Sequence, residues 1–283
     1  MGRYEEAIRT LEGTKTLNSL FISLKTKYKE EIGVEYKDIN MEKIEAFTKW
    51  LHDGGAKFDK VKMKYYGKDY RGVHAFKAIK KDDVILNIPK HLIITPQRGR
   101  DTNIGKLVIK SGITISWDHL FYITLFLLEQ FHNEKSSWKP YMDMYPRDVS
   151  SFPMFYSAKE KKMLKGSPML EHIVSEYEEI KAEYEKVARA VPEFRKFTLD
   201  EYMKNKMLAI SRIFFVKMHG VDDRIMVPLA DMFNHHYEKV GQTQWRYEDK
   251  KEAFIVDAKR NIPIGDAVLF YLILDMRKLW GKT

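Results

Sequence analysis

The sequence contains no cysteine among its 283 residues. Disulfide bonds and zinc sites built from thiolates are therefore excluded. The longest largely apolar stretch, from Leu120 to Leu128, is far shorter than the roughly 20 residues that a membrane-spanning helix needs. A secretory hydrophobic segment is also missing near the N-terminus. Together these absences predict an intracellular protein, in the cytoplasm or the nucleus, with no membrane partner.

Long runs of charge of one sign are scarce as well. The chain carries 49 basic and 40 acidic side chains, a formal net charge of +9 at pH 7. Both signs occur together in segments such as residues 159–162 (KEKK) and 178–181 (EEIK). Because this mixture is typical of a solvated, lysine-rich surface, nucleic acid is an unlikely partner. The excess of positive charge still favours association with acidic molecules.

The most informative feature that is present is an Asn-His pair directly after an apolar stretch. Residues 227–236 read VPLADMFNHH, and a second apolar run at residues 267–270 leads into Tyr271. Alone, such a pair is often a turn followed by a hydrogen-bonded imidazole. Asp231 and His235 are four residues apart, a spacing that would place two metal ligands on one face of a helix, and His236 follows directly. However, no second His/Glu pair with ligand spacing accompanies them, so we predict no metal site.

The order of these features resembles the carboxyl-terminal half of SET-domain protein methyltransferases. More narrowly, it is similar to the branch that contains the Rubisco large-subunit lysine methyltransferases, in which a long insert interrupts the SET domain. Five further segments match this branch in the right order, which makes coincidence a poor explanation. They are residues 47–56 (FTKWLHDGGA), 70–75 with 78–89 (YRGVHA, AIKKDDVILNIP), 137–146 (SWKPYMDMYP), 152–157 (FPMFYS) and 211–214 (SRIF).

The resemblance implies an α+β protein, a SET-domain β-fold of short strands with a pseudoknot-like core that a helical insert interrupts. It divides the chain into a helical N-terminal extension (1–40), an N-terminal SET half (41–96), a helical insert (97–200) and a C-terminal SET half (201–283). The sequence ends at Thr283, so we expect no carboxyl-terminal substrate-docking domain.

Hydrophobic periodicity predicts the same order of elements. A helical pattern begins at Met41 and stops at the Gly-Gly pair of residues 54–55, where glycine tolerates a left-handed cap. Alternating apolar residues then predict short strands at residues 61–65 and 84–88. Between residues 97 and 200 the alternation gives way to helical spacing.

Later elements are predicted by turn and capping signals. The TLDE sequence at residues 198–201 has capping-box spacing, so we expect a helix that starts at Thr198 and carries Arg212 towards its end. Residues 245–247 and 253–256 flank a charged turn, as in a hairpin. Two stripes at helical spacing are expected to face the core. They are Trp117, Phe121, Thr124, Leu125, Leu128 and Phe131, and Leu170, Ile173, Val174, Tyr177, Ile180, Tyr184 and Val187.

The resemblance also implies a cofactor, S-adenosylmethionine. Asn234 and His235 match the pair that holds this cofactor in the branch. Arg212 matches a residue that contacts its carboxylate, and Asp69 and Arg71 occupy positions whose backbone lies along it. At each position the alternative is a structural hydrogen bond or a surface residue.

Tyr271 matches the catalytic tyrosine beside the methyl-transfer channel. The implied function is that of an S-adenosylmethionine-dependent protein-lysine N-methyltransferase, acting on a non-histone protein. Two departures, Tyr70 and Leu272 at positions where glycine is usual, leave a catalytically weak SET-like binding module as an alternative. Protein-histidine methylation is a second alternative, but Phe214 and Ala230 favour lysine. The actin-methylating relative has a polar segment and a tryptophan in those regions.

Overall fold

The computed structural model describes residues 37–66, 71–236 and 242–271. The chain falls into two compact units, residues 1–42 and 43–283. Asp69, Tyr70 and Leu272 lie outside the described residues, as does most of the predicted N-terminal extension.

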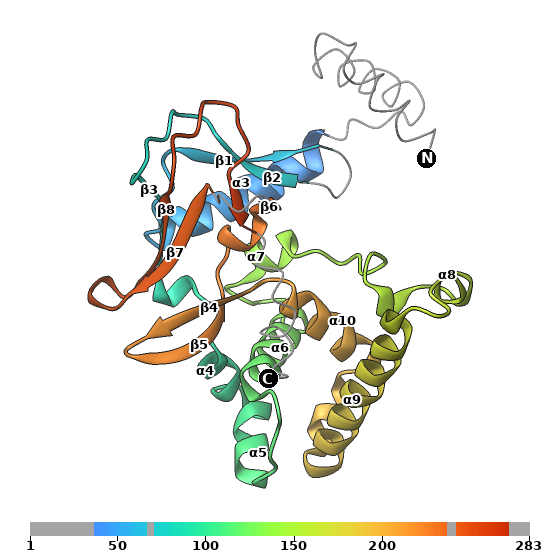
Figure 1. Ribbon diagram of the computed structural model, residues 1–283. Helices are drawn as coiled ribbons and strands as arrows, with labels where there is room; N and C mark the ends of the chain where they lie inside the picture. The colour runs from blue at the N-terminus through green and yellow to red at the C-terminus, as the bar shows by residue number, and fades with distance from the viewer. Residues whose placement is uncertain (1–36, 67–70, 237–241, 272–283) are drawn as a thin grey trace. The chain divides into compact units, whose positions relative to one another are not determined.

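Short strands precede and follow a series of helices along the described chain (Figure 1). The elements are α3 (Lys37–Asp53), β1 (Val61–Tyr65), β2 (Arg71–Ala75), β3 (Val84–Pro89), α4 (Pro96–Arg100), α5 (Asn103–Ser111), α6 (Asp118–Phe131), α7 (Lys139–Met144), α8 (Ala158–Met163), α9 (Pro168–Ala190), α10 (Leu199–Ile210), β4 (Ile213–Met218), β5 (Val221–Met226), β6 (Asn234–His236), β7 (Thr243–Glu248), β8 (Ala253–Ala258) and β9 (Leu269–Tyr271).

Strands that are far apart in the sequence pair with one another. β8 lies between β3 and β7 in an antiparallel sheet, β1 pairs with β2, and β4 with β5. β6 pairs with β9 in parallel. Isolated bridges join His74 to Ala267 and Ile79 to Ile262. The strands before the helices are therefore interleaved with the strands after them, which is the α+β arrangement that was predicted.

α6 is buried on nearly all sides, which explains its continuous apolar sequence. Every residue from Leu120 to Leu128 is at most 6% exposed. The first predicted stripe is confirmed, but burial extends around the whole helix. Residues on one side of α6 share a cluster with the strands, and those on the other side share a second cluster with α5, α9 and α10. The two sets are Leu120, Ile123, Phe126 and Leu127, and Phe121, Tyr122, Leu125 and Leu128.

The predicted capping box is confirmed, but the predicted end of the helix is wrong. The Thr198 hydroxyl accepts a hydrogen bond from the Glu201 amide, and the Glu201 carboxylate accepts one from the Thr198 amide. α10 ends at Ile210, so Arg212 lies beyond it, in the turn before β4. β-branched and aromatic residues dominate β4 (IFFVKM) and favour the extended strand.

The predicted β7–β8 hairpin is confirmed. β4 and β5 form a hairpin that was not predicted, around His219 and Gly220, whose φ angles of 49° and 81° suit a two-residue turn.

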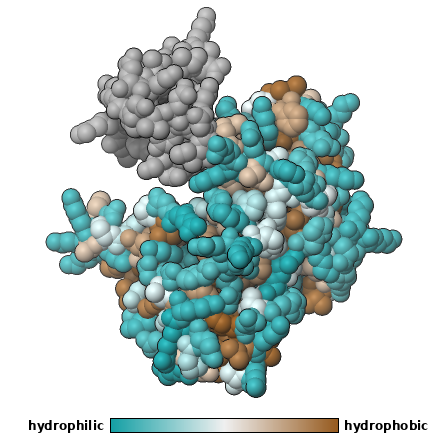
Figure 2. Space-filling model, turned by 180° about the vertical axis from the view of Figure 1, so that it is seen from behind, coloured by the Kyte–Doolittle hydropathy of each residue, from teal (hydrophilic) through white to brown (hydrophobic). Residues whose placement is uncertain are grey.

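The second predicted stripe is only partly confirmed. Ile173, Ile180 and Val187 are buried, whereas Val174 and Tyr177 on α9 are 56% and 38% exposed. The face of the protein in Figure 2 is mostly hydrophilic, with hydrophobic residues in small separate areas. None of the described helices is long and apolar enough to cross a membrane.

A partly buried carboxyl group lies on α9 where it packs against α10. Glu183 of α9 pairs with the buried Lys206 of α10. Glu176, two turns earlier, has a side chain that is only 11% exposed. Burial, and then the charge of Glu179, raise the pKa of Glu176 to about 7, with Lys206 acting in the opposite direction. The folded protein therefore favours the neutral form of this carboxyl group.

We expect Glu176→Gln to make stability less dependent on pH. The ordinary pKa is 4.5 and the folded one about 7, so the native state binds the extra proton between these values, and stability falls as pH rises through this interval. Glutamine removes this penalty, so the free energy of unfolding should rise by roughly 1–3 kcal/mol near pH 8 and little near pH 4.5. Urea unfolding at both pH values measures it. Glu178→Gln, an exposed carboxylate on the same helix, is the control. Equal effects of Glu176→Gln at both pH values would contradict the expectation.

Candidate functional site

The Asn-His pair begins β6 directly after a tight backbone turn. Leu229 has a φ of 72°, which is rare for a residue with a bulky side chain, and it precedes a short 3-10 helix, η4 (Ala230–Met232). Leu229 and η4 are largely buried, so apolar packing holds this strained turn. The chain then leaves the core, with Asn234 half-buried and His235 exposed.

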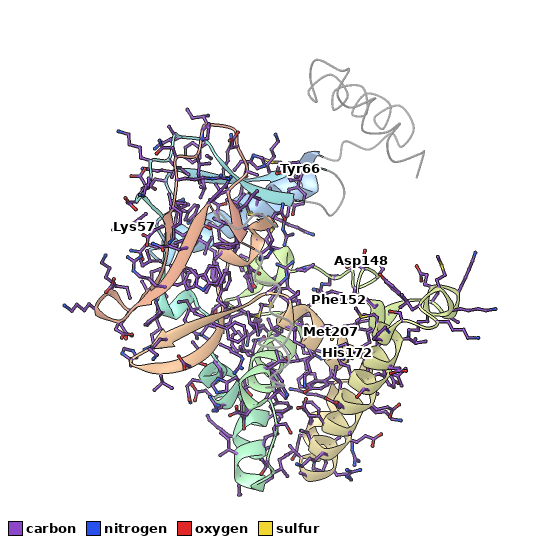
Figure 3. All side chains as sticks on the ribbon, in the orientation of Figure 1. Lys57, Tyr66, Asp148, Phe152, His172 and Met207 are labelled. Carbon is purple, nitrogen blue, oxygen red and sulfur yellow. The ribbon has the colours of Figure 1, made fainter. Side chains whose placement is uncertain are left out.

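Asn234 contacts the backbone of β2. Its side-chain amide donates a hydrogen bond to the carbonyl oxygen of Arg71 over 3.1 Å. A Cβ atom added to Gly72 would lie 2.8 Å from Asn234 Nδ2 and 2.9 Å from the hydroxyl oxygen of Tyr66. Tyr66 lies just beyond β1 (Figure 3) and hydrogen-bonds His74. Gly72 thus lets the Asn234 amide and the Tyr66 hydroxyl lie against the β2 backbone, where a larger residue would collide with both.

The parallel pairing of β6 with β9 brings the two motifs of the sequence together. Asn234 is opposite Leu269, His235 opposite Phe270, and His236 opposite Tyr271. The rings of Phe233 and Phe270 stack with centroids 4.8 Å apart. The backbone of Tyr271 therefore lies beside the Asn-His pair, although the two are 35 or more residues apart in the sequence.

Arg212 points its guanidinium at the turn that carries η4. Its Nη1 donates to the carbonyl oxygen of Asp231 over 2.7 Å and to Asp231 Oδ2 over 3.2 Å. The Tyr141 hydroxyl donates to the same Oδ2 over 2.8 Å. The Asp231 side chain is completely buried and that of Arg212 is 19% exposed. This network joins α7, the turn after α10, and η4.

Three buried polar atoms of this network have no hydrogen-bond partner among the residues that the structure describes. They are Arg212 Nε, Asp231 Oδ1 and the hydroxyl of Tyr145, whose ring centroid lies 5.7 Å from the Arg212 guanidinium. Unpaired buried groups are costly and rare, so these atoms mark a place where a water molecule or a ligand would be stabilised. Arg71 adds another link to α7, because its guanidinium donates to the Met144 carbonyl oxygen.

Burial and charge shift the pKa values of this region. Burial is the largest effect and lowers the pKa of Arg212, but Asp231, Tyr145 and Tyr141 together raise it, so the net shift is upward. Burial, and then the charge of Asp231, raise the pKa of Tyr141 well above its ordinary value. His235 is exposed as a whole residue, but its imidazole is partly desolvated; this desolvation, and then the charge of Arg212, lower the pKa of His235. At neutral pH the site therefore contains a neutral Tyr141, a mostly neutral His235, and an ion pair.

The structure brings Arg71, Asn234, His235 and Arg212 into one region, with the backbone of Tyr271 beside them. Asp69 lies outside the described residues. In the part of the chain that is described, no group of three or more His, Asp or Glu side chains could hold a metal ion.

Sequence reasoning missed Tyr141, Tyr145 and Tyr66 as parts of this region. Tyr141 and Tyr145 belong to the segment at residues 137–146 that matched the resemblance, but only the fold shows that they meet Asp231 and Arg212. An isolated Asp within the apolar stretch at residues 227–233 was the available signal for a buried acceptor.

Comparisons with known proteins identify the family of this chain. The SET domain family model matches residues 70–271. An Arabidopsis thaliana [fructose-bisphosphate aldolase]-lysine N-methyltransferase is 30% identical over 69% of this chain, and a Pisum sativum Rubisco large-subunit N-methyltransferase is 30% identical over 68%. A Drosophila melanogaster actin-histidine N-methyltransferase is 25% identical over 44% of the chain. The chain spans 40%, 39% and 22% of the length of these relatives.

Solved structures have the same fold. A Rubisco LSMT bound to AdoMet aligns with a TM-score of 0.67 and 26% identity, over 82% of this chain and 53% of that one. The SET domain of LSMT bound to lysine and AdoHcy aligns with a TM-score of 0.71 and 24% identity, over 83% and 54%. The interleaved strands, the helices between them and the family match lead to one conclusion: this chain belongs to the SET-domain family, in the branch of the Rubisco large-subunit methyltransferases.

Proposed function

We propose that this chain is an S-adenosylmethionine-dependent protein-lysine N-methyltransferase that acts on an intracellular, non-histone protein. The observation that carries the proposal is the contact of the Asn234 amide with the Arg71 carbonyl beside Gly72, next to the β6–β9 pair that holds Tyr271. This hydrogen bond joins β2 to β6, the two segments that the resemblance assigns to cofactor binding. The names of the lysine-methylating relatives support the same reaction.

The residues present fit this cofactor. Gly72 lets the polar side chains of Asn234 and Tyr66 approach the β2 backbone, since a Cβ there would lie within 3 Å of both. Asn234 and His235 would hold the cofactor with polar side-chain and backbone groups, and the backbones of Asp69 and Arg71 would lie along it. Arg212 would bind its carboxylate, for which a forked guanidinium is well suited.

The cofactor supplies an electrophilic methyl group on a sulfonium sulfur. The amine nitrogen forms the new bond to the methyl carbon while the carbon–sulfur bond breaks, and its electron pair stays on sulfur. The protein mainly holds donor and acceptor in line and keeps water out. The attacking lysine must be neutral, but its free pKa of ~10.4 leaves it charged at neutral pH. Burial favours the neutral amine because it disfavours the charged ammonium. Tyr271 would orient the amine with its hydroxyl.

Phe214 and Ala230 favour lysine over histidine as the methyl acceptor. Phe214, two residues after Arg212, is buried among Trp245, Phe254 and Phe270. Ala230 is completely buried. Neither offers a polar group that could hold an imidazole ring in a fixed orientation. A weak SET-like binding module remains as the outcome in which cofactor binds but no protein is methylated.

The proposed cofactor contact can be tested with Asn234→Ala. Calorimetry should show that the parent binds S-adenosylmethionine and S-adenosylhomocysteine. The variant loses a side-chain hydrogen bond and leaves its partners unpaired, so the free energy of binding should weaken by roughly 1–3 kcal/mol in a folded protein. Gln244→Ala removes an exposed amide on β7 and is the control. A parent that binds neither compound at millimolar concentration would contradict the proposed function.

Tyr271→Phe should separate binding from chemistry. It keeps the ring and deletes the hydroxyl proposed to orient the amine. Cofactor affinity should change little, while methyl transfer in single-turnover assays should fall by about 10²-fold or more. The parent rate should rise with pH, because the amine must lose its proton before it attacks. Tyr177→Phe, at a partly exposed tyrosine on α9, is the control. Unchanged transfer by Tyr271→Phe would mean that this tyrosine is not in the channel.

A further inference from the structure

We propose that Tyr141, in the helices between the two halves of the β structure, is a positioning residue for Arg212. Its hydroxyl fixes the Asp231 carboxylate, which in turn holds the guanidinium in the orientation in which it can bind a ligand carboxylate. The inference rests on the proposed function and extends it to a residue of α7.

The first step is the geometry at a single oxygen atom. Asp231 Oδ2 accepts from the Tyr141 hydroxyl at 2.8 Å and from Arg212 Nη1 at 3.2 Å. Arg212 Nη1 also donates to the Asp231 main-chain oxygen at 2.7 Å. One nitrogen of the guanidinium therefore makes every contact with Asp231, and the Nε of Arg212 is left without a partner among the described residues.

This one-sided contact is unusual for a buried Asp–Arg pair. A carboxylate that faces a guanidinium prefers two parallel hydrogen bonds, one from each of two nitrogens. Asp231 has a second oxygen, Oδ1, that is buried and has no described partner, so it is chemically able to take such a bond. The hydroxyl of Tyr141 also donates to Oδ2, so a rotation of the carboxylate towards Arg212 Nε would break this hydrogen bond.

The consequence is that part of the guanidinium stays available. The Arg212 side chain is 19% exposed, so it can be reached from outside, while the Asp231 side chain is completely buried and cannot be. Without the Tyr141 hydroxyl, Asp231 would compete for the same donors as an incoming carboxylate. Arg212 lies beyond the end of α10, so the helix does not fix its side chain.

The rest of α7 keeps Tyr141 in place. The Tyr141 ring is completely buried and packs against Phe47, Trp138 and Tyr145. The guanidinium of Arg71 holds the Met144 carbonyl at the end of the same helix. Tyr141→Phe therefore removes one hydroxyl from a rigid setting and leaves the packing intact.

The test compares two ligands that differ in one group. S-adenosylhomocysteine carries the amino-acid carboxylate, whereas 5′-methylthioadenosine has the same nucleoside and a thioether without it. Calorimetry should show that Tyr141→Phe weakens the binding of S-adenosylhomocysteine about tenfold. The affinity for 5′-methylthioadenosine should change by no more than about twofold. In an Arg212→Lys background, Tyr141→Phe should have no further effect, because the hydroxyl acts only through the guanidinium.

Tyr202→Phe is the matched control. Tyr202 is also completely buried and also donates its hydroxyl to a carboxylate, that of Glu183, but it belongs to the cluster of α9 and α10. The Tyr202→Phe substitution should lower thermal stability without changing the affinity for either ligand. Equal weakening of both ligands by Tyr141→Phe, or a loss of stability with unchanged affinity, would overturn the inference and leave the proposed function standing. A parent protein that binds neither ligand would overturn both.

Discussion

The completely buried carboxylate of Asp231 is the group on which the arrangement of the site depends. It accepts hydrogen bonds from α7 through Tyr141 and from the turn after α10 through Arg212. A buried charge that loses its partner typically costs about 3–5 kcal/mol, so neither donor can move away without a large penalty. Asp231 also lies three residues before Asn234, within the turn that aims the Asn-His pair. The Asp231 carboxylate therefore links three segments that are far apart in the sequence: α7, the turn after α10, and η4.

The helices between β3 and β4 belong to the same folding unit as the strands. Tyr141, Met144 and Tyr145 around α7 lie in the hydrophobic cluster that contains the strands. α6 has one side in this cluster and the other side in the cluster of α9 and α10. Because interiors are close-packed, a change in one cluster is felt across α6 in the other. α7 lies in the same cluster as Val73 of β2 and Phe233 before β6, so the proposed action of Tyr141 on Arg212 needs no long-range relay.

Sequence reasoning succeeded where the signal is local. The capping box at Thr198 and Glu201 and the strands β1 and β3 were predicted from neighbouring residues, and they are confirmed. Burial alternates along β1, but in β3 a register irregularity leaves Val84 exposed and Ile85 buried. The end of α10 was misjudged because strand propensity and pairing with β5 take over at Ile213. The parallel β6–β9 pair and the contact of Tyr141 with Asp231 join residues 35 and 90 positions apart. Such partners are chosen by the packed fold, so only the resemblance anticipated that the segments of Asn234 and Tyr271 lie side by side.

The charges of the site suit a ligand that is itself positively charged at sulfur. A free arginine would repel a sulfonium, but Arg212 is paired with Asp231, and this pair adds no net charge. The pKa of His235 is lowered by burial and by Arg212, so the imidazole is mostly neutral near pH 7. Arg212 is the second cause of this shift, after burial, and its own charge is balanced by the buried Asp231 carboxylate. Because this balance requires Asp231 to stay in place beside Arg212, the donors that hold its carboxylate matter to the proposed chemistry.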